Sequence, residues 1–250
     1  MTTLAAIQAR IASTRLPGKV MMPLAGVPLV ERVVHRVDRA DEVDETVVAT
    51  SERDPHDVVA SVAEAAGAKV YRGSEQDVLG RLHGAAIEHG ADTVVRICAD
   101  SPLVSASILD PAVRLLRRES HDYVSNKLRR TFPLGMDVEA FTMQAFDTVE
   151  DRSADPHERE HVTVYFRDNP DEFSRGNLSA DAVFEDPALH DRSELRVTLD
   201  EPADYSLLRQ VFCAHESGAP TPQEAIRFID RHGLADVNRD VQQKSMYDVE

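Results

Sequence analysis

Three cationic side chains, two hydroxyls and a glycine fall within residues 9–19, which read Ala-Arg-Ile-Ala-Ser-Thr-Arg-Leu-Pro-Gly-Lys. This segment follows a short apolar run and precedes a helical pattern that starts near Pro28. A buried strand, a cationic loop and a helix are a common phosphate-binding arrangement, because backbone N–H groups and cationic side chains both favour an anion. Arg10 and Arg15 could each grip two phosphate oxygens, and Lys19 could add a mobile point charge. An Arg-rich, solvated surface loop is the alternative.

Two aspartates, Asp100 and Asp200, each come directly after an apolar run of strand-like composition. The carboxyl ends of parallel strands line the ligand crevice of an open α/β sheet, so both carboxylates could face the cationic loop. Mg²⁺ typically takes one or two protein carboxylates together with substrate phosphates and water. Each aspartate could instead cap the helix that follows it, helped at the second position by Pro202. Finding two such aspartates favours the magnesium interpretation.

The loop 9–19 resembles the N-terminal signature of sugar-activating cytidylyltransferases. These include the KDO cytidylyltransferases, the acylneuraminate cytidylyltransferases and the spore-coat polysaccharide protein F group, to which the order and spacing of the motifs are most similar. The family carries one acidic residue after the central strand and another in a D-x-P-x-D-like segment near the C-terminus, and Asp100 and Asp200 match these places. KDO enzymes read Gln-Gly-Asp-Glu-Pro where residues 98–102 read Cys-Ala-Asp-Ser-Pro, and Ser101 therefore puts KDO itself in doubt as the substrate.

Two further segments carry polar side chains that could meet a substrate. Residues 72–81 resemble the family segment that follows the third strand and faces the nucleotide. A turn at Gly73, with Asp77 capping the next helix, would explain the same residues. The cations within residues 127–130 would suit an anionic acceptor, and a solvated loop is the alternative there.

The resemblance brings three groups of candidate residues into one site. The nucleotide-binding group is Ala9, Arg10, Ser13, Arg15, Lys19, Arg72 and Ser74. The acceptor-binding group is Asn126, Arg129, Asp137, Glu160 and His161. The catalytic group is Arg10, Lys19, Asp100 and Asp200, and its two aspartates are the expected ligands of Mg²⁺.

The function implied by the resemblance is that of an enzyme, a CTP-dependent nucleotidyltransferase. It would transfer CMP from CTP to a small anionic sugar, such as a sugar acid, and release pyrophosphate, for polysaccharide or glycoconjugate biosynthesis. Positioning and neutralisation of the triphosphate would supply most of the catalysis. Another nucleotide, a non-sugar acceptor and a non-catalytic binding protein stay open as alternatives.

Residues 157–161, His-Glu-Arg-Glu-His, offer an alternative of another class. They match H-E-x-x-H, in which two histidines one helical turn apart hold zinc and the glutamate acts as general base. A zinc metallohydrolase would then use His157, Glu158 and His161. Charged residues at both positions between Glu158 and His161, and the lack of a third ligand at a suitable spacing, argue against this activity.

The elements that must position these residues alternate between short β-rich runs and amphipathic helical stretches. This alternation predicts an α/β fold with a mainly parallel sheet and helices on both faces. Strands are predicted over 4–9, 46–50, 70–72, 93–99, 122–126, 135–141 and 195–199. Helices are predicted over 27–39, 54–67, 77–89, 107–119, 142–151, 156–169, 202–215 and 221–232. The order resembles the nucleotide-diphospho-sugar transferase fold, a Rossmann-like, GT-A-like sandwich whose first half binds the nucleotide.

The alternation changes after Asn126, and residues 170–194 are polar and irregular in pattern. We predict a single nucleotidyltransferase domain over 1–250 that contains a substrate and dimerisation lobe over 127–194. A lobe of this size cannot build its own core, so its apolar side would gain by packing against a second copy in a homodimer. A monomer with the lobe folded against its own sheet is the alternative.

Composition restricts the partners and the compartment. The net charge is −16, with 44 acidic and 28 basic residues, which argues against a nucleic-acid partner. No apolar stretch approaches the roughly 18 residues that span a bilayer, and no signal-peptide pattern opens the chain. We therefore expect a cytoplasmic protein without a membrane partner. The acidic surface would suit a high-salt cytoplasm, and an ordinary acidic mesophile with an Arg-rich codon bias is the alternative. Cys98 and Cys213 are too few and too widely spaced for a disulfide framework.

Overall fold

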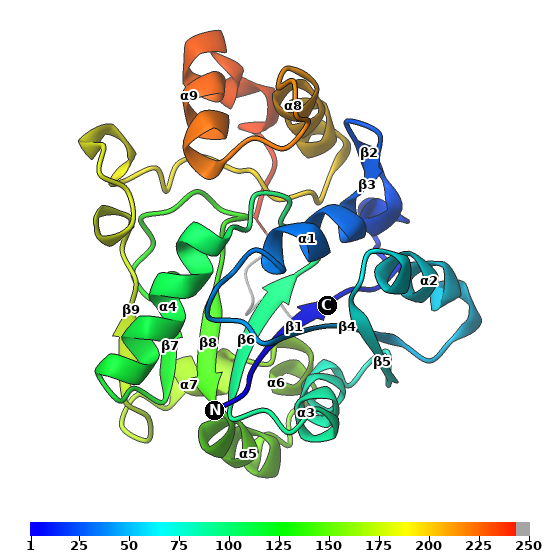
Figure 1. Cartoon of the computed structure of the whole chain (residues 1–250), viewed down its shortest axis with the longest axis vertical. Coiled ribbons are helices and arrows are strands. Elements are labelled where there is room, and N and C mark those ends of the chain that lie inside the picture. The colour runs from blue at the N-terminus through cyan, green and yellow to red at the C-terminus, as the bar shows by residue number, and fades with distance from the viewer. Residues whose placement is uncertain (244–250) are drawn as a thin grey trace.

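The computed structural model describes residues 1–243 and shows a seven-stranded sheet in the order β5-β4-β1-β6-β8-β7-β9 (Figure 1). Its strands are β1 (Thr3–Gln8), β4 (Glu45–Ser51), β5 (Lys69–Gly73), β6 (Thr93–Cys98), β7 (Tyr123–Ser125), β8 (Glu139–Thr142) and β9 (Arg175–Asn177). Strand β8 is antiparallel to both of its neighbours, and the other pairs in the sheet are parallel. A small antiparallel ribbon is made by β2 (Pro23–Leu24) and β3 (Val27–Pro28). The predicted α/β fold with a mainly parallel sheet is therefore confirmed.

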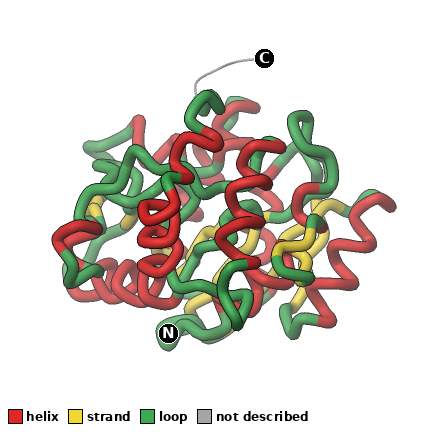
Figure 2. The backbone as a smooth tube through the Cα atoms, turned by 90° about the horizontal axis from the view of Figure 1, so that it is seen from above, coloured by secondary structure: helices red, strands yellow, loops and turns green. Residues whose placement is uncertain are grey.

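Helices cover both faces of this sheet (Figures 1 and 2). They are α1 (Leu29–Val37), α2 (Asp57–Ala65), α3 (Val78–Glu88), α4 (Ala106–Arg118), α5 (Met143–Arg152), α6 (Pro156–His161), α7 (Val164–Asp168), α8 (Pro202–Cys213) and α9 (Pro222–His232). Short 3₁₀ helices lie at Lys19–Met21, Asp54–His56, Ala180–Ala182, Pro187–Leu189 and Leu234–Asn238. None of the helices within residues 1–243 is both long and apolar enough to cross a membrane.

The two faces bury separate hydrophobic cores, because neighbouring side chains on a strand point to opposite sides of the sheet. Ala5 and Ile7 of β1 pack into the core that contains α1, α2 and α4, together with α8 and α9. Leu4 and Ala6 pack into the core formed with α3, α5 and α7. Burial on both faces explains why β1 reads as a continuous apolar run rather than an alternating one.

The helices begin and end near the residues that the sequence predicts. Asp77 caps α3, with its Oδ1 accepting a hydrogen bond from the Gly80 N–H at 2.9 Å. Gly90 follows the same helix at φ 59°, in the left-handed region that glycine tolerates. Thr221 and Glu224 form a capping box at the start of α9.

The segment 195–199 is buried but is not a strand, so that prediction was wrong. It makes a single parallel bridge, between Leu134 and Arg196. Its other backbone contacts include a hydrogen bond from the Leu199 N–H to the Asp100 carbonyl at 2.9 Å. Burial against the loop before β8, rather than pairing in the sheet, accounts for its apolar composition. The segment still delivers Asp200 next to Asp100.

The predicted helix 156–169 is divided into α6 and α7, which corrects a second prediction. Val162 adopts φ 58°, an unusual conformation for a β-branched residue, and this ends α6. Both Val162 and Thr163 are fully buried. The break lets the Thr163 hydroxyl donate a hydrogen bond to Glu139 Oε1 at 2.7 Å. A continuous helix would place the Thr163 side chain differently.

Three smaller predictions also need correction. The helix predicted over 27–39 begins at Leu29, because residues 27–28 pair in the β2–β3 ribbon. The strand predicted over 135–141 is limited to residues 139–142. The stretch 170–194, predicted to be irregular, contains β9 at the edge of the sheet. Short strands carry few residues and therefore too weak a pattern for sequence to reveal.

Candidate active site

The cationic loop 9–19 follows β1, the strand that lies between β4 and β6. The loop folds back on itself, because the Gly18 N–H donates to the Ile11 carbonyl at 3.0 Å and the Lys19 N–H donates to the Leu16 carbonyl at 3.2 Å. Gly18 has φ 73°, so the glycine of the motif supplies a left-handed turn. This turn directs Lys19 back toward the carboxyl ends of the strands.

Lys19 lies between the two aspartates singled out from the sequence. Its Nζ is 2.7 Å from Asp100 Oδ2 and 2.7 Å from Asp200 Oδ1. Arg15 Nη2 also lies 3.1 Å from Asp200 Oδ1. Burial by itself would lower the pKa of Lys19, but the two carboxylates outweigh it and raise that pKa above its ordinary value. Burial likewise opposes ionisation of Asp200, yet Lys19 and the neighbouring arginines lower its pKa.

Neither aspartate is the N-cap of the helix that follows it. Ser105 caps α4, and Glu201 occupies the N-cap position of α8 in a capping box with Asp204. The alternative that Asp100 and Asp200 serve as ordinary helix caps therefore has no support in the geometry. Both carboxylates instead converge on the ammonium of Lys19.

The donor set suits a hard cation. Two carboxylate oxygens from different segments face one positively charged atom, the Lys19 ammonium, which stands where a metal ion would meet the same oxygens. Within residues 1–243, no group of three or more His, Cys, Asp or Glu side chains is arranged to hold a metal. A divalent ion held by Asp100 and Asp200 would therefore take its remaining ligands from substrate phosphates and water, as Mg²⁺ commonly does.

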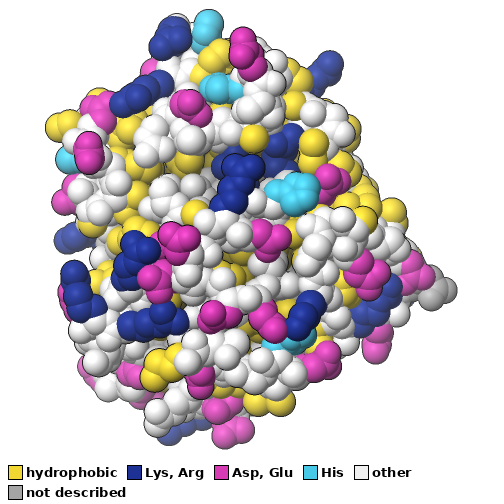
Figure 3. Space-filling view, in the orientation of Figure 1, with side chains coloured by type: hydrophobic (Ala, Val, Ile, Leu, Met, Phe, Trp, Pro, Cys, Tyr) yellow, Lys and Arg dark blue, Asp and Glu magenta, His cyan; other side chains and the backbone are white. Residues whose placement is uncertain are grey.

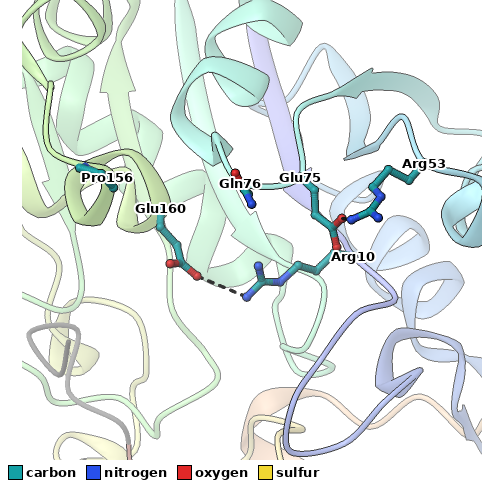
Figure 4. A pocket seen from close by; sticks show the side chains of 6 residues that line it. All are labelled: Arg10, Arg53, Glu75, Gln76, Pro156 and Glu160. Carbon is teal, nitrogen blue, oxygen red and sulfur yellow. Dashed lines mark hydrogen bonds and ion pairs between the residues drawn. The ribbon is translucent and has the colours of Figure 1, made fainter. Parts of the chain in front are cut away.

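A pocket of about 510 Å³ lies beside the loop (Figure 4). Its lining residues are Arg10, Arg53, Glu75, Gln76, Pro156 and Glu160. Arg10 Nη2 lies 3.5 Å from Glu160 Oε1, and Arg53 Nη1 donates to Glu75 Oε2 at 2.7 Å. The pocket thus brings together one residue predicted to bind nucleotide, Arg10, and one predicted to bind the acceptor, Glu160. Glu75 and Gln76 lie within residues 72–81, which resemble the family segment that faces the nucleotide, whereas Arg53 and Pro156 were not singled out from the sequence.

The remaining nucleotide-binding candidates make contacts within the chain. Arg72 Nη1 donates to Asp57 Oδ1 at 2.6 Å. Ser74 Oγ accepts a hydrogen bond from the Asp77 N–H at 3.1 Å, so this hydroxyl helps to build the turn before α3. Ala9 is buried, and Ser13 Oγ accepts from the Leu16 N–H at 3.4 Å within the loop. Their roles toward a nucleotide stay predictions.

The acceptor-binding candidates lie around the carboxyl end of β7 and on α6. Asn126 is fully buried, and its amide bonds the backbone of residues 136 and 138 at 2.8 and 3.0 Å. Asp137 Oδ1 pairs with Arg130 Nη1 at 2.5 Å, and Arg129 is exposed. His161 is half-buried, and burial, assisted by His157, lowers its pKa. Their contacts to a substrate stay predictions as well.

A buried ionic network lies behind the site, and sequence reasoning missed it. Glu139 Oε2 accepts from Arg96 Nη1 at 2.6 Å and lies 3.3 Å from Lys127 Nζ. Its Oε1 accepts from the Tyr123 hydroxyl at 2.6 Å and from Thr163 at 2.7 Å. The signal that could have revealed it is the presence of Arg96 and Glu139 in strands that are otherwise apolar. Such residues need a partner when buried.

The H-E-x-x-H segment forms α6 but does not form a zinc site with the described residues. The rings of His157 and His161 lie 4.5 Å apart between centroids. Residues 1–243 supply no third ligand for them. Arg159, the middle residue of the motif, instead ties α6 to α3 and α5, donating to Asp77 at 2.9 Å and to Glu150 at 2.8 Å. The motif is therefore explained by helix packing.

Known proteins resemble this chain over most of its length. A family model described as cytidylyltransferase matches residues 4–225. The spore coat polysaccharide biosynthesis protein SpsF of Bacillus subtilis (strain 168) is 29% identical over 240 residues, which cover 94% of this chain and 96% of that protein.

Two solved structures resemble the chain as well. A cytidylyltransferase structure from Leptospira borgpetersenii serovar Hardjo-bovis (strain JB197) is similar with a TM-score of 0.87 and 28% identity, covering 98% of this chain and all of that one. A CMP:2-keto-3-deoxy-manno-octonic acid synthetase, solved in complex with CTP, shares the fold with a TM-score of 0.63 at 15% identity, covering 86% of this chain and 99% of that chain.

Proposed function

The chain belongs to the cytidylyltransferase family, and from that premise we propose that it transfers CMP from CTP to a small anionic sugar and releases pyrophosphate. The observation that carries the proposal is the convergence of Lys19 and Arg15 with Asp100 and Asp200 at one edge of the sheet. Such a mixture of fixed cations and carboxylates suits a metal-bound triphosphate. The synthetase of similar fold that was solved with CTP supports the choice of nucleotide.

In the proposed reaction, a hydroxyl oxygen of the acceptor sugar attacks the α-phosphorus of CTP, the bond to the pyrophosphate leaving group breaks, and the hydroxyl proton passes to water. Arg10, Arg15 and Lys19 bind the phosphates and offset the charge that moves onto the leaving group. No covalent bond to the protein is needed. The chain contributes by holding the reacting groups in line, which accounts for much of the rate gain in this class of reaction.

Asp100 and Asp200 would hold Mg²⁺, which supplies further neutralisation of phosphate charge when it is bound. The Lys19 ammonium lies 2.7 Å from an oxygen of each aspartate, where the metal would bind. Under the proposal, Lys19 therefore leaves the aspartates and contacts the phosphates when substrate enters. A four-carbon stem with rotatable bonds suits a lysine to this movement better than an arginine.

The acceptor-binding residues are part of the same proposal. Arg129, Asp137, Glu160 and His161, with Asn126 shaping the loop, would face the sugar. Arg129, an exposed cation near the carboxyl end of β7, favours an acceptor with a carboxylate or phosphate. The name of the SpsF relative supports a role in polysaccharide biosynthesis. We propose in addition a cytoplasmic homodimer in which residues 127–194 meet the second copy.

Two features bear on the partners that the surface could accept. Acidic and basic side chains are interspersed on the face in Figure 3, rather than gathered into one large basic area. Many arginines are paired with carboxylates, as Arg192 is with Asp230 at 2.7 Å and Arg114 is with Glu42 at 2.8 Å. The charge of −16 also favours small substrates over nucleic acid.

The test is a pyrophosphate-release assay across the four ribonucleoside triphosphates with a panel of sugar acids and neutral sugars. We expect release with CTP only, and only when Mg²⁺ and an anionic sugar are present. Release with GTP or UTP but not CTP would refute the choice of nucleotide. No release with any combination would favour a non-catalytic binding protein.

Matched variants test the two aspartates. Asparagine has nearly the same size and shape as aspartate, so Asp100→Asn and Asp200→Asn keep the side-chain volume while removing a metal-binding charge. We expect both variants to lose metal-dependent turnover. Asp236→Asn, at an exposed position, is the control and should leave turnover unchanged. Retained turnover and Mg²⁺ dependence in both active-site variants would refute the metal-binding role.

A further inference from the structure

Asp200 is held on both of its oxygens. Its Oδ1 faces Lys19 and Arg15, and its Oδ2 accepts a hydrogen bond from Arg196 Nη2 at 2.7 Å. Arg196 is only 9% exposed, so hydrogen bonds to the protein, rather than to water, hold its guanidinium in place. The hydrogen bond to Oδ2 therefore determines which oxygen of Asp200 points toward the cationic loop.

Arg196 is fixed in turn by Asp204, a fully buried carboxylate in the first turn of α8. Asp204 Oδ1 accepts from Arg196 Nε at 2.9 Å, and its Oδ2 accepts from Arg196 Nη2 at 3.1 Å, as in a two-point arginine–carboxylate pair. The same Oδ2 accepts from the backbone N–H of Asp200 at 3.0 Å and of Glu201 at 2.9 Å. Asp204 thus fixes both the backbone of Asp200 and the arginine that holds its side chain.

The C-terminal part of the described chain completes this network. After α9, the chain returns toward the middle of the molecule (Figure 1). It forms the 3₁₀ helix Leu234–Asn238, whose last residue, Asn238, is buried. Asn238 Nδ2 donates to Asp204 Oδ1 at 2.8 Å and to the Arg196 carbonyl at 3.0 Å. This residue lies beyond residues 4–225, the part of the chain that matches the family model.

We propose that Asn238 is a positioning residue for Asp200. Its amide bonds Asp204 and the backbone of Arg196, and these two residues set the orientation of the Asp200 carboxylate. Without the amide, the Arg196 carbonyl and Asp204 Oδ1 each lose a hydrogen-bond donor. Neighbouring groups can replace these hydrogen bonds only by moving. Arg196 then turns, and Oδ1 of Asp200 no longer holds its place beside Asp100. The inference rests on the proposed role of Asp200 as a metal ligand.

The test uses Mn²⁺ as a probe and the full chain without an acceptor, so that no reaction occurs. The relaxation rate of water protons measures how tightly each variant binds Mn²⁺·CTP. Calorimetry with CTP in the presence of a chelator measures metal-free binding. Loss of a partner that orients a metal ligand commonly weakens metal binding by 10- to 100-fold, so we expect Asn238→Ala to weaken Mn²⁺·CTP binding about 10-fold. The affinity for metal-free CTP should change less than 2-fold, which corresponds to about 0.4 kcal/mol of binding free energy.

Two further variants make the result specific. Asn238→Asp keeps the volume but brings a carboxylate against Asp204, so we expect a larger loss of Mn²⁺·CTP binding. Asp236→Ala, in the same 3₁₀ helix but exposed, is the control and should match the wild type.

Each outcome decides one question. Unchanged Mn²⁺·CTP binding in both Asn238 variants would overturn the positioning role, as would an equal loss of metal-bound and metal-free CTP binding, which indicates general loosening of the fold. Failure of the wild type itself to bind Mn²⁺·CTP would overturn the proposed function, and with it the premise of this inference.

Discussion

Replacing Glu139 with glutamine should destabilise the fold more than any exposed charge substitution. Glu139 is 3% exposed and lies between Arg96 and Lys127, with two hydroxyls on its other oxygen. The Glu139→Gln variant would keep the shape of the side chain, and its amide oxygen could still accept hydrogen bonds from the cations, but the negative charge would be lost. The substitution would therefore leave two buried positive charges without a negative partner.

The size of the effect follows from this burial. Removing one member of a buried ion pair costs about 3–5 kcal/mol, because the remaining charge stays desolvated. In a domain of this size, each kcal/mol lowers Tm by about 2–4 °C. Glu139→Gln should thus lower Tm by about 6–20 °C at pH 7. Exposed ion pairs contribute far less, about 0–1 kcal/mol, so Glu172→Gln, which removes the exposed partner of Arg152, is the matched control.

The pH dependence of the difference provides a second measurement. Burial alone would raise the pKa of Glu139, but Lys127 and Arg96 outweigh it and hold that pKa well below its usual range. A carboxylate whose pKa is depressed by folding stabilises the protein fully above its unfolded pKa, about 4.3. That contribution falls as the pH drops below this value toward the folded pKa. The gap in stability between wild type and Glu139→Gln should therefore be constant from pH 6 to 8 and shrink in acid.

Thermal and urea unfolding, followed by circular dichroism at pH 7 and at pH 3, would measure both effects. A Tm for Glu139→Gln within 2 °C of the Glu172→Gln control would refute the reasoning, because the network would then contribute no more than an exposed pair. A gap that widens in acid would refute the sign of the pKa shift.

Four other outcomes follow from the structure. Lys19→Ala should lower kcat/KM for CTP by about 10²–10³-fold, as other losses of a preorganised charge do, and unchanged kinetics would exclude Lys19 from phosphate binding. Burial raises the pKa of Cys98 to about 11, so a thiol reagent at pH 8 should label the exposed Cys213 first, and equal labelling would contradict the burial. Metal analysis of protein purified without added zinc should find far less than one zinc per chain, and a full equivalent lost in His161→Ala would revive the zinc hypothesis. Light scattering at physiological and at molar salt should give twice the 27.7 kDa of one chain, and 27.7 kDa in both would exclude the homodimer.

The sequence was sufficient to predict most strands of the sheet and the meeting of Asp100 and Asp200 with the cationic loop, because each rests on local patterns. Strands such as β1 are buried on both faces and read as short apolar runs, and turn glycines mark the ends of α2 and α3. Asp100 and Asp200 could be paired because the carboxyl ends of strands share one edge of a sheet. Asp200 does lie beside the cationic loop, although the segment before it is not a strand. Residues 195–199 read as a strand because they are buried.

The features that sequence could not predict depend on contacts between distant segments. Glu139 is bonded by residues from β6, from β7 and from the break between α6 and α7, and no spacing in the sequence relates them. The division of α6 from α7 at Val162 follows from the burial of Thr163 against Glu139, whereas the local pattern favours a continuous helix. Asn238 carries no motif, and its proposed role rests on its contacts with Asp204 and Arg196.

The segment 195–199 also has a consequence for the order in which a working enzyme is made. A growing chain that has reached residue 190 already contains all seven strands of the sheet, the cationic loop and Asp100. It lacks Asp200, which closes a contact with Lys19 across 181 residues. Contacts of such separation form late, because the ends of a long loop must first be brought together. Under the proposed role of Asp200, we therefore expect the protein to gain its chemistry only after residues 195–238 have packed against the rest of the chain.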